Sequence, residues 1–437
     1  MVYEARKGNR NYLFWVGLAL CTIYQSYRYP LQISNAGTSP TYSDTPLGLQ
    51  AGKFVLASPL IALSAVRWLS NSARLPRWPI VLGTLFLSSF CLIKILNSHD
   101  SQYLDVSFWM LFSLVLVLSV EFVSVSSLDR YFCLVLAYAF GSTLVQIFLF
   151  FAFGRLPALA FEGGYLVRFG GFLDDPNGFA AIWFLLMGWS YRRFKGWKRF
   201  LILTGIVVSL LLTQSWTAIA FFFAMLFALV LFIAFKHRLS AMLAICVLPF
   251  FAVFVMQLIP LIQQGFLLEV LAAKQTSIED HIFPWAFWAS RWSDWALLGG
   301  GVYSAYESWW AAALVNFGVL WFGAYLLLIA ALLICLWRAF SKAVPEAKPV
   351  YAGLLLFACY FSVGSLNLPF PIIFPINALF FMLLFLSAFG KIGPQKGAIV
   401  SSSGRGGDSS DGRLWTNKTP TAIFKLPRAK EMSAPRL

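Results

Sequence analysis

The chain has 437 residues, of which 59% are hydrophobic and 12% are charged, and its mean hydropathy is +0.75. An ordinary soluble domain carries about 25% charged residues. Here 33 Lys and Arg with 18 Asp and Glu are too few to cover a soluble core that holds 44 Phe, 17 Trp and 16 Tyr. The composition therefore excludes soluble enzyme folds and predicts a membrane protein with many spans. In such a protein the net charge of +15 reflects where basic residues lie relative to the bilayer, and it does not indicate a nucleic acid partner.

Apolar runs long enough to cross about 30 Å of hydrocarbon recur along the chain as far as residue 390. We predict an all-α polytopic membrane protein of about twelve transmembrane helices in one membrane domain, 1–390. The runs at 54–69, 178–191 and 200–213 are shorter than a typical span, so the count can differ by one. The expected spans lie near 11–27, 54–69, 78–96, 107–124, 131–152, 178–191, 200–213, 216–235, 240–259, 317–337, 350–365 and 372–389.

The distribution of charge predicts the orientation of these spans. With the N-terminus inside, most of the 33 Lys and Arg fall in cytoplasmic segments, as the positive-inside rule requires. These segments are 67–77, 192–199, 236–238, 338–348 and the tail 391–437. Both termini are therefore expected in the cytoplasm, and the first span is expected to be retained, because no small-residue cleavage site follows it.

The long outer connections are expected to carry the function, because more than half of the 18 acidic residues lie outside in this orientation. They are 28–50, 153–176 and a large outer loop at about 260–308, which begins with an amphipathic stretch suited to the membrane interface. The tail 391–437 is rich in Ser, Gly, Pro and basic residues, and we predict that it is a disordered cytoplasmic segment.

A first candidate site lies at the end of the second long outer connection, in the sequence from Arg168 to Gly178. Gly171 allows a tight turn beside Arg168, Asp175 or Asn177 can cap the next helix, and Pro176 suits the first turn of that helix. This pattern is either a plain capped loop or an anion site, since an arginine beside a helix N-terminus suits a lipid phosphate or diphosphate.

A second candidate lies late in the large loop, where Arg291 and Trp295 precede three glycines, Gly299–Gly301. Successive glycines indicate close approach of the backbone to a ligand or to another loop. No Gly-Lys-Ser/Thr follows them, so a nucleotide phosphate loop is a poor match. Arg291 either pairs with Asp294 or binds the ligand.

A third candidate is Glu307, just before the apolar run Trp309–Trp337. An acid in the first turn of a helix is favoured by the helix dipole, so Glu307 is either a structural acid or a general base. The three histidines and six cysteines show no paired ligand spacing, and we expect neither a metal nor another cofactor. All six cysteines lie within or at the ends of apolar runs, so we expect them to be small core residues.

The order Arg168-x-x-Gly171-x3-Asp175-Pro176-Asn177 resembles the Arg/Gly/Asp-Pro-Asn signature of the bacterial O-antigen polymerase and O-antigen ligase superfamily. Thr213-Gln-Ser215 resembles that family's Thr-x-Ser-Arg turn, and Glu307-Ser308-x9-Gly318 resembles the ligases' motif, which begins with histidine. The resemblance covers about residues 130–340.

The sequence departs from the ligase pattern at several positions. Glu307 replaces the ligase histidine, Trp216 stands where an arginine commonly follows the serine, and Trp321 replaces the last glycine of the ligase motif. These differences favour a repeat-unit polymerase over a ligase.

The resemblance implies a metal-independent glycosyltransferase of the bacterial inner membrane, with its active site on the periplasmic face. The donor would be a glycan on undecaprenyl diphosphate and the acceptor a second glycan, with a flippase and a chain-length regulator as possible partners. Arg168, Arg291 and Glu307 would be catalytic, and Gly171, Asp175, Asn177, Trp295 and Gly301 would bind substrate.

Three other functions stay open on the sequence. One is ligase-type transfer of glycan to a different acceptor, and another is a peptidoglycan-type glycan polymerase with a related all-helical fold. The third is a twelve-span transporter or flippase of lipid-linked glycan, although the sequence shows neither an internal repeat nor ionisable groups near mid-membrane, as many transporters do.

Overall fold

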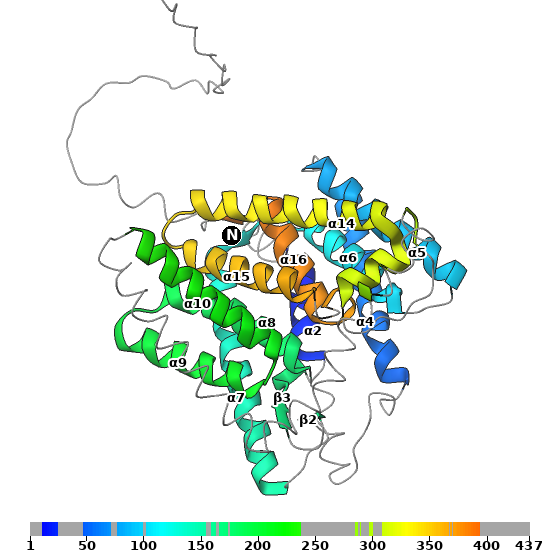
Figure 1. Ribbon diagram of the computed structural model, residues 1–437. Coiled ribbons are helices and arrows are strands. Elements are labelled where there is room, and N and C mark those ends of the chain that lie inside the picture. The colour runs from blue at the N-terminus through cyan, green and yellow to red at the C-terminus, as the bar shows by residue number, and fades with distance from the viewer. Residues whose placement is uncertain are drawn as a thin grey trace, which may run out of the picture. The chain divides into compact units, whose positions relative to one another are not determined.

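The computed structural model describes residues 11–24, 47–70, 77–98, 102–153, 159–162, 166–173, 175–236, 285–286, 289, 297–299, 308–366, 368 and 370–393. Within these ranges the chain forms eleven α-helices, which pack side by side (Figure 1). They are α2 (Tyr12–Ile23), α4 (Leu47–Ser70), α5 (Trp78–Ser98), α6 (Gln102–Ser119), α7 (Val125–Phe153), α8 (Pro176–Arg193), α9 (Gly196–Leu212), α10 (Trp216–Lys236), α14 (Trp309–Lys342), α15 (Lys348–Gly364) and α16 (Ile376–Ala388).

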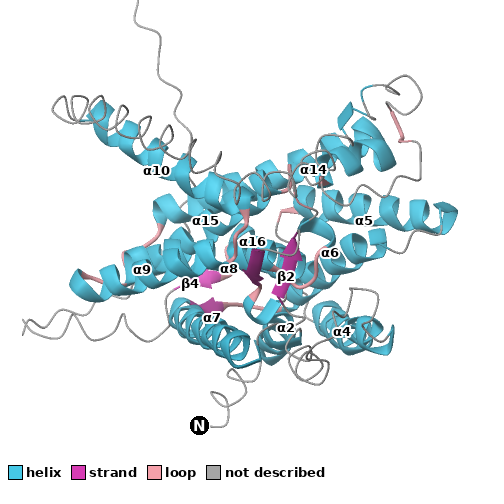
Figure 2. Ribbon diagram, turned by 60° about the horizontal axis from the view of Figure 1, so that its bottom comes forward, coloured by secondary structure: helices cyan, strands magenta, loops and turns pink. Residues whose placement is uncertain are grey.

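Two pairs of very short strands accompany the helices (Figure 2). β2 (Leu159–Glu162) and β3 (Leu166–Phe169) form an antiparallel hairpin, and β1 (Val123–Ser124) lies parallel to β4 (Ile392–Gly393). Two short 3-10 turns, η4 (Gly171–Leu173) and η5 (Phe370–Ile372), precede α8 and α16.

A helix lies at every expected span except 240–259, which falls outside the described ranges. The predicted mostly helical fold is thus confirmed for the described part of the chain. Three of its helices, Ala51–Ser70, Val125–Ala152 and Trp309–Lys342, are long and apolar enough to cross a membrane, and six shorter apolar helices accompany them. The larger number of twelve spans stays a prediction.

Two helices extend well beyond the apolar runs that predict them. α4 begins at Leu47 instead of residue 54, and its added turns include Lys53, whose Nζ lies 2.7 Å from Asp105 Oδ1 on α6. Hydropathy alone ends the run at this lysine, whereas a paired charge is compatible with a helix packed in a bundle. α14 begins at Trp309, as expected for a helix that starts before the bilayer, and Gly318 interrupts it with non-helical backbone angles.

The tightest helix contact joins α8 and α15, which run antiparallel beside each other (Figure 1). A Cβ added at Gly353 would lie 2.7 Å from the Leu185 carbonyl oxygen, and one added at Gly188 would lie 2.6 Å from that of Ala352. Small residues allow such backbone approach, which is a main source of packing energy between helices in lipid.

Gly353→Ala is therefore expected to destabilise the bundle by about 1–3 kcal/mol, because the added methyl group overpacks the contact. Gly141→Ala on α7 is the matched control, since a Cβ there meets nothing within 4 Å. Thermal unfolding of both variants in detergent measures the difference. Equal stability of the two would contradict the close contact.

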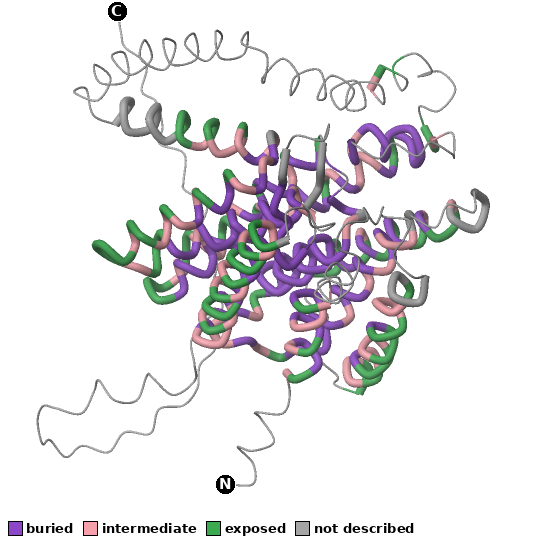
Figure 3. Tube along the Cα trace, turned by 90° about the horizontal axis from the view of Figure 1, so that it is seen from below, coloured by how far each residue is buried: buried purple, intermediate pink, exposed green. Residues whose placement is uncertain are grey.

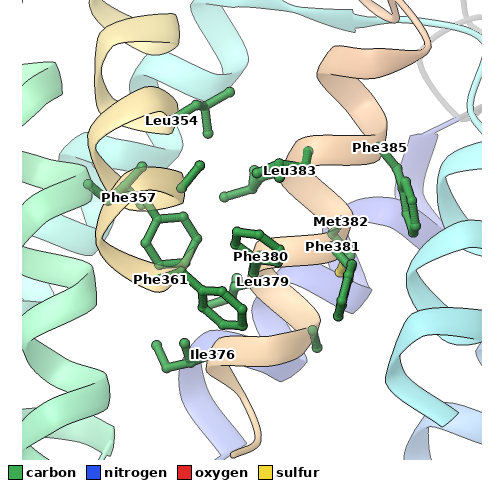
Figure 4. Close-up of a cluster of buried hydrophobic side chains, with 14 of the residues drawn as sticks. Leu354, Phe357, Phe361, Ile376, Leu379, Phe380, Phe381, Met382, Leu383 and Phe385 are labelled. Atoms are coloured by element: carbon green, nitrogen blue, oxygen red, sulfur yellow. The ribbon is translucent and has the colours of Figure 1, made fainter. Parts of the chain in front are cut away.

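The core of the described bundle centres on α16, all of whose residues are buried. Figure 3 shows buried residues in the interior and exposed residues on the outward sides of the surrounding helices. Phe357 and Phe361 of α15 face Phe380 of α16 (Figure 4), and the rings of Phe361 and Phe380 stack with centroids 3.8 Å apart. A helix that is apolar on every side is expected to be fully surrounded by other helices.

Contacts between helix ends define two opposite ends of the bundle. At the first, which we call the Arg193 end, Arg193 pairs with Asp129 at 3.0 Å, and Lys391 Nζ donates to the carbonyl oxygens of Val117, Leu118 and Val120 near the end of α6. Lys391 and the β4 residues, which the sequence places in the tail, thus belong to the packed bundle. The other end, which we call the Arg168 end, holds the Lys53–Asp105 pair and the start of α14.

The cysteines only partly follow the expectation that they are small core residues. Cys21 and Cys91 are buried, whereas Cys133 and Cys359 are exposed on the outside of the bundle. The core assignment is wrong for these two positions, because an apolar run in a membrane protein includes outward-facing residues as well as buried ones.

Candidate functional site

Arg168 lies on β3, and the hairpin brings its side chain into the bundle, where the residue is only 7% exposed. Its Nε donates to the Thr213 carbonyl oxygen at 3.2 Å, and its Nη2 donates to Asn177 Oδ1 at 2.9 Å. A guanidinium can make several such contacts in one plane. Arg168 therefore joins the start of α8 to the turn between α9 and α10.

Gly171 turns the chain three residues after Arg168, in a space too small for any other residue. Its φ is +57°, and an added Cβ would lie 2.1 Å from the Phe179 ring. The expected tight turn at this glycine is confirmed. Only glycine suits the position, because the backbone is left-handed and the Phe179 ring leaves no room for a side chain.

Gln146 of α7 fixes this turn and was not found by the sequence analysis. The Gly171 N–H donates to Gln146 Oε1 at 2.8 Å, and Gln146 Nε2 donates to the Gly171 carbonyl oxygen at 3.2 Å. The side chain is 2% exposed. Irregular backbone inside a membrane bundle needs such partners, and the signal in the sequence was a single glutamine inside the apolar run 131–152.

Gln146→Glu is expected to give a protein whose stability and activity fall as the pH rises. A protonated carboxyl group can both donate and accept, as the amide does, whereas a carboxylate only accepts and loses the bond to the Gly171 carbonyl oxygen. Thermal unfolding and activity measured from about pH 5 to 8 would show recovery at low pH. Gln146→Leu, which lacks both bonds, is the control and should show no recovery.

Asp175, one of the two residues that the sequence offered as a cap, caps α8. Its carboxylate accepts the N–H groups of Asn177 at 3.1 Å and Gly178 at 2.8 Å, and Pro176 occupies the first helical position. The idea that these free amides bind an anion together with Arg168 is wrong for this state, because Asp175 already occupies them. An anion site here must rest on the arginine and its other neighbours.

The turn Thr213–Ser215 lies against Arg168 and is built to end one helix and start the next. Thr213 Oγ1 donates to the Leu210 carbonyl oxygen at 2.7 Å and accepts the Ser215 N–H at 3.3 Å. Ser215 Oγ accepts the Ala218 N–H at 3.4 Å in the first turn of α10. Thr213 and Ser215 are both buried, so the resemblance at this turn corresponds to residues that contact the Arg168 site.

Tyr360 of α15 adds a polar group to the same place and was also missed. Its fully buried hydroxyl group lies beside Ser215 and forms no well-aligned hydrogen bond among the described residues, and it interacts electrostatically with Arg168 and Asp175. A buried polar group without a good partner has a cost. In the sequence Tyr360 has no distinguishing mark among the aromatic residues of its span.

The first turn of α14 begins near this site. Ser308 caps α14, and its hydroxyl donates to the Leu366 carbonyl oxygen, while the Trp310 N–H donates to the Ser365 carbonyl oxygen at 3.3 Å. Ser365 follows the end of α15, the helix that carries Tyr360. Ser308 therefore lies at the Arg168 end of the bundle.

The remaining sequence-based candidates, Arg291, Trp295, Gly301 and Glu307, lie outside the described ranges. The structure thus brings together Arg168, Gly171, Asp175 and Asn177. The chain next to the third candidate, Glu307, is described only from Ser308 onward.

Gly299 is the one residue of the Gly299–Gly301 run that the structure describes. Its φ is +74°, and an added Cβ would lie 2.4 Å from the Asn316 carbonyl oxygen, at the interruption of α14. Gly318 has a φ of +78°, and a Cβ added there would lie 2.5 Å from the Leu297 carbonyl oxygen. This oxygen accepts the Leu320 N–H at 3.4 Å. The close backbone approach that the sequence predicts for the glycines is therefore confirmed at Gly299, whose backbone packs against the break in α14.

Neither a known protein family nor a metal centre can be assigned directly. No family model matches the sequence, and no curated protein matches it. Among the described residues no group of three or more His, Cys, Asp or Glu side chains is arranged to hold a metal ion. The functional argument therefore depends on the Arg168 site and on the sequence motifs around it.

Proposed function

We propose that the protein is a membrane glycosyltransferase that polymerises oligosaccharide repeat units carried on undecaprenyl diphosphate, in the synthesis of an O-antigen, capsule or exopolysaccharide. It would act without a metal ion at the periplasmic face of the bacterial inner membrane. The observation that carries the proposal is the buried Arg168, held between Asn177 and the Thr213 turn. These are the positions at which the sequence resembles the polymerase and ligase superfamily.

The position of Arg168 suits a lipid-linked anion better than a soluble one. The arginine lies at the end of a helical bundle whose longest helices are apolar enough to cross a membrane. A diphosphate at the membrane surface would reach this end without leaving the lipid. A guanidinium in a poorly hydrated site interacts strongly with such a group.

The reaction follows from the donor chemistry. A hydroxyl oxygen of the acceptor glycan attacks the anomeric carbon, and the bond from that carbon to the diphosphate breaks, with its electron pair leaving on the diphosphate. Glu307 receives the hydroxyl proton as general base. Arg168 and Arg291 stabilise the charge that grows on the leaving group. Gly171, Asp175, Asn177, Trp295 and Gly301 shape the donor and sugar sites.

The direct test is incubation of the purified full-length protein with a lipid-diphosphate-linked repeat unit. Polymerisation gives a ladder of longer glycans and releases undecaprenyl diphosphate. Transfer of one glycan to a different acceptor without a ladder would instead support a ligase. Movement of the intact lipid-linked glycan across vesicle membranes, with no new glycosidic bond, would support a flippase and reject the enzyme.

The orientation can be tested separately. We expect both termini in the cytoplasm and the loop 260–308 in the periplasm, because the basic residues concentrate in segments on the opposite side. A cysteine introduced by Ser277→Cys should react with a membrane-impermeant thiol reagent in cells whose inner membrane is intact. Labelling only after the inner membrane is opened would place the loop in the cytoplasm and overturn the orientation.

A further inference from the structure

The turn between α8 and α9, at the Arg193 end, carries a dense group of basic residues. Five of its eight residues from 192 to 199 are basic: Arg192, Arg193, Lys195, Lys198 and Arg199. All of these except the half-buried Arg199 are exposed. We call this segment the 192–199 turn.

Little of this positive charge is neutralised within the protein. Arg193 pairs with Asp129, whereas Lys195 and Lys198 have no ion-pair partner among the described residues. Lys195 is also the N-cap of α9 and makes no capping bond, and the first turn of α9 contains no acid. Cations at a helix N-terminus are unfavourable, so an external anion would relieve this repulsion.

Aromatic residues border the basic ones on the same turn. Tyr191 is 53% exposed and Trp197 is 68% exposed, and the Arg199 guanidinium lies 5.4 Å from the Tyr191 ring centroid. Exposed tyrosine and tryptophan beside cations are typical of the headgroup level of a membrane. These rings indicate that the 192–199 turn meets lipid headgroups and not only water.

The exposed surface of α9 then becomes apolar. Phe200, Leu201, Val208 and Leu211 are all 45% to 69% exposed and follow the turn along the helix. The cations would meet the phosphate group of a phospholipid, the aromatic rings would lie at the membrane interface, and the apolar side chains would meet the acyl chains. An acidic soluble protein would match the cations but not the apolar surface that continues from them.

A second helix end contributes basic groups next to the turn. The Arg192 guanidinium lies 6.0 Å from the centroid of the Phe340 ring on α14. Within one helical turn of Phe340, α14 also carries Arg338 and Lys342, both exposed. The end of α14 and the 192–199 turn thus present cations to the same region.

We propose that the 192–199 turn, with the neighbouring end of α14, binds the phosphate group of an anionic phospholipid in the membrane leaflet at the Arg193 end. Basic surfaces between helix ends on the cytoplasmic side are suited to such headgroups. This site lies at the opposite end of the bundle from Arg168, and it does not depend on whether the protein transfers glycans.

The test uses the purified full-length protein in detergent, titrated with short-chain phosphatidylglycerol or with short-chain phosphatidylcholine as the neutral counterpart. Phosphatidylglycerol should raise the unfolding temperature and stay bound in native mass spectrometry, while phosphatidylcholine should do neither. Lys195→Gln with Lys198→Gln should weaken the phosphatidylglycerol response by about 30-fold, the loss expected for two basic residues near an anionic lipid.

Arg67→Gln with Arg74→Gln is the matched control, because it removes the same charge from the last turn of α4 and the segment that follows it. The control should bind phosphatidylglycerol like the unsubstituted protein. Lys195→Arg with Lys198→Arg keeps the charge and should also bind normally, which separates loss of charge from damage to the fold. An equal response of the glutamine variant and the control, or an equal effect of both lipids, would overturn the proposal.

Discussion

Arg168→Lys is expected to reduce polymer formation by about 10²–10³-fold, the usual loss when one preorganised group that stabilises transition-state charge is removed. Lysine keeps the positive charge but cannot donate to Thr213 and Asn177 at once in the geometry of the guanidinium. Donor binding should weaken together with turnover, because both involve the diphosphate. Rates measured over a range of lipid-linked donor concentrations would separate the two effects.

Arg168 also supports the fold, so the comparison needs a control arginine that holds a partner away from the site. Arg193 donates to both carboxylate oxygens of Asp129 at 3.0 Å, at the opposite end of the bundle. Arg193→Lys should cost little stability, because this pair is half exposed, and it should leave polymer formation close to normal. If both variants lose activity in proportion to their unfolding temperatures, Arg168 is a structural residue and the proposed anion site is wrong.

The sequence predicted the helical runs well because a bilayer imposes one strong requirement, a long apolar segment. It predicted the helix ends less well, since ends depend on partners elsewhere in the chain. Lys53 ends the apolar run by its charge, yet α4 continues through it because Asp105 of α6 lies 2.7 Å away. A pairing between residues so distant in sequence leaves no signal in local hydropathy.

In the Arg168 site, too, the sequence predicted features with a local signal and missed those that depend on distant partners. The residues with unusual backbone or capping roles, Gly171 and Asp175, could be recognised because glycine, aspartate and proline have strong local preferences. Gln146 and Tyr360 could not, because each lies in a plain apolar run and becomes important only through a contact with another helix. The sequence left a capped loop and an anion site at the start of α8 as alternatives, and it could not show that Asp175 occupies the first amides.

The second large effect is expected at Glu307, the proposed general base. Glu307→Gln should reduce polymer formation by about 10²–10⁴-fold, the range that base catalysis contributes. The amide keeps the size of the side chain and removes only the proton acceptor. Membrane insertion and donor binding should therefore stay normal, so that the loss appears in turnover and not in donor affinity.

The position of the neighbouring residues supports this role. Ser308 and Trp310 hold the start of α14 against the end of α15, and α15 carries Tyr360 next to Arg168. Glu307 precedes Ser308 directly in the sequence, and Ser308 lies at the Arg168 end of the bundle. We therefore expect a base at position 307 to act on the same side of the membrane as the arginine that would hold the leaving group.

Glu346→Gln is the control for this substitution, because Glu346 is an exposed acid in the connection between α14 and α15, at the opposite end of α14. It should leave polymer formation unchanged. If Glu307→Gln makes polymer at the same rate as this control, with normal expression, Glu307 is only an acid at a helix start. The acceptor would then have to be activated by Asp174, Asp175, Asp294 or His281, or the reaction would depend on stabilisation of the leaving diphosphate by arginine alone.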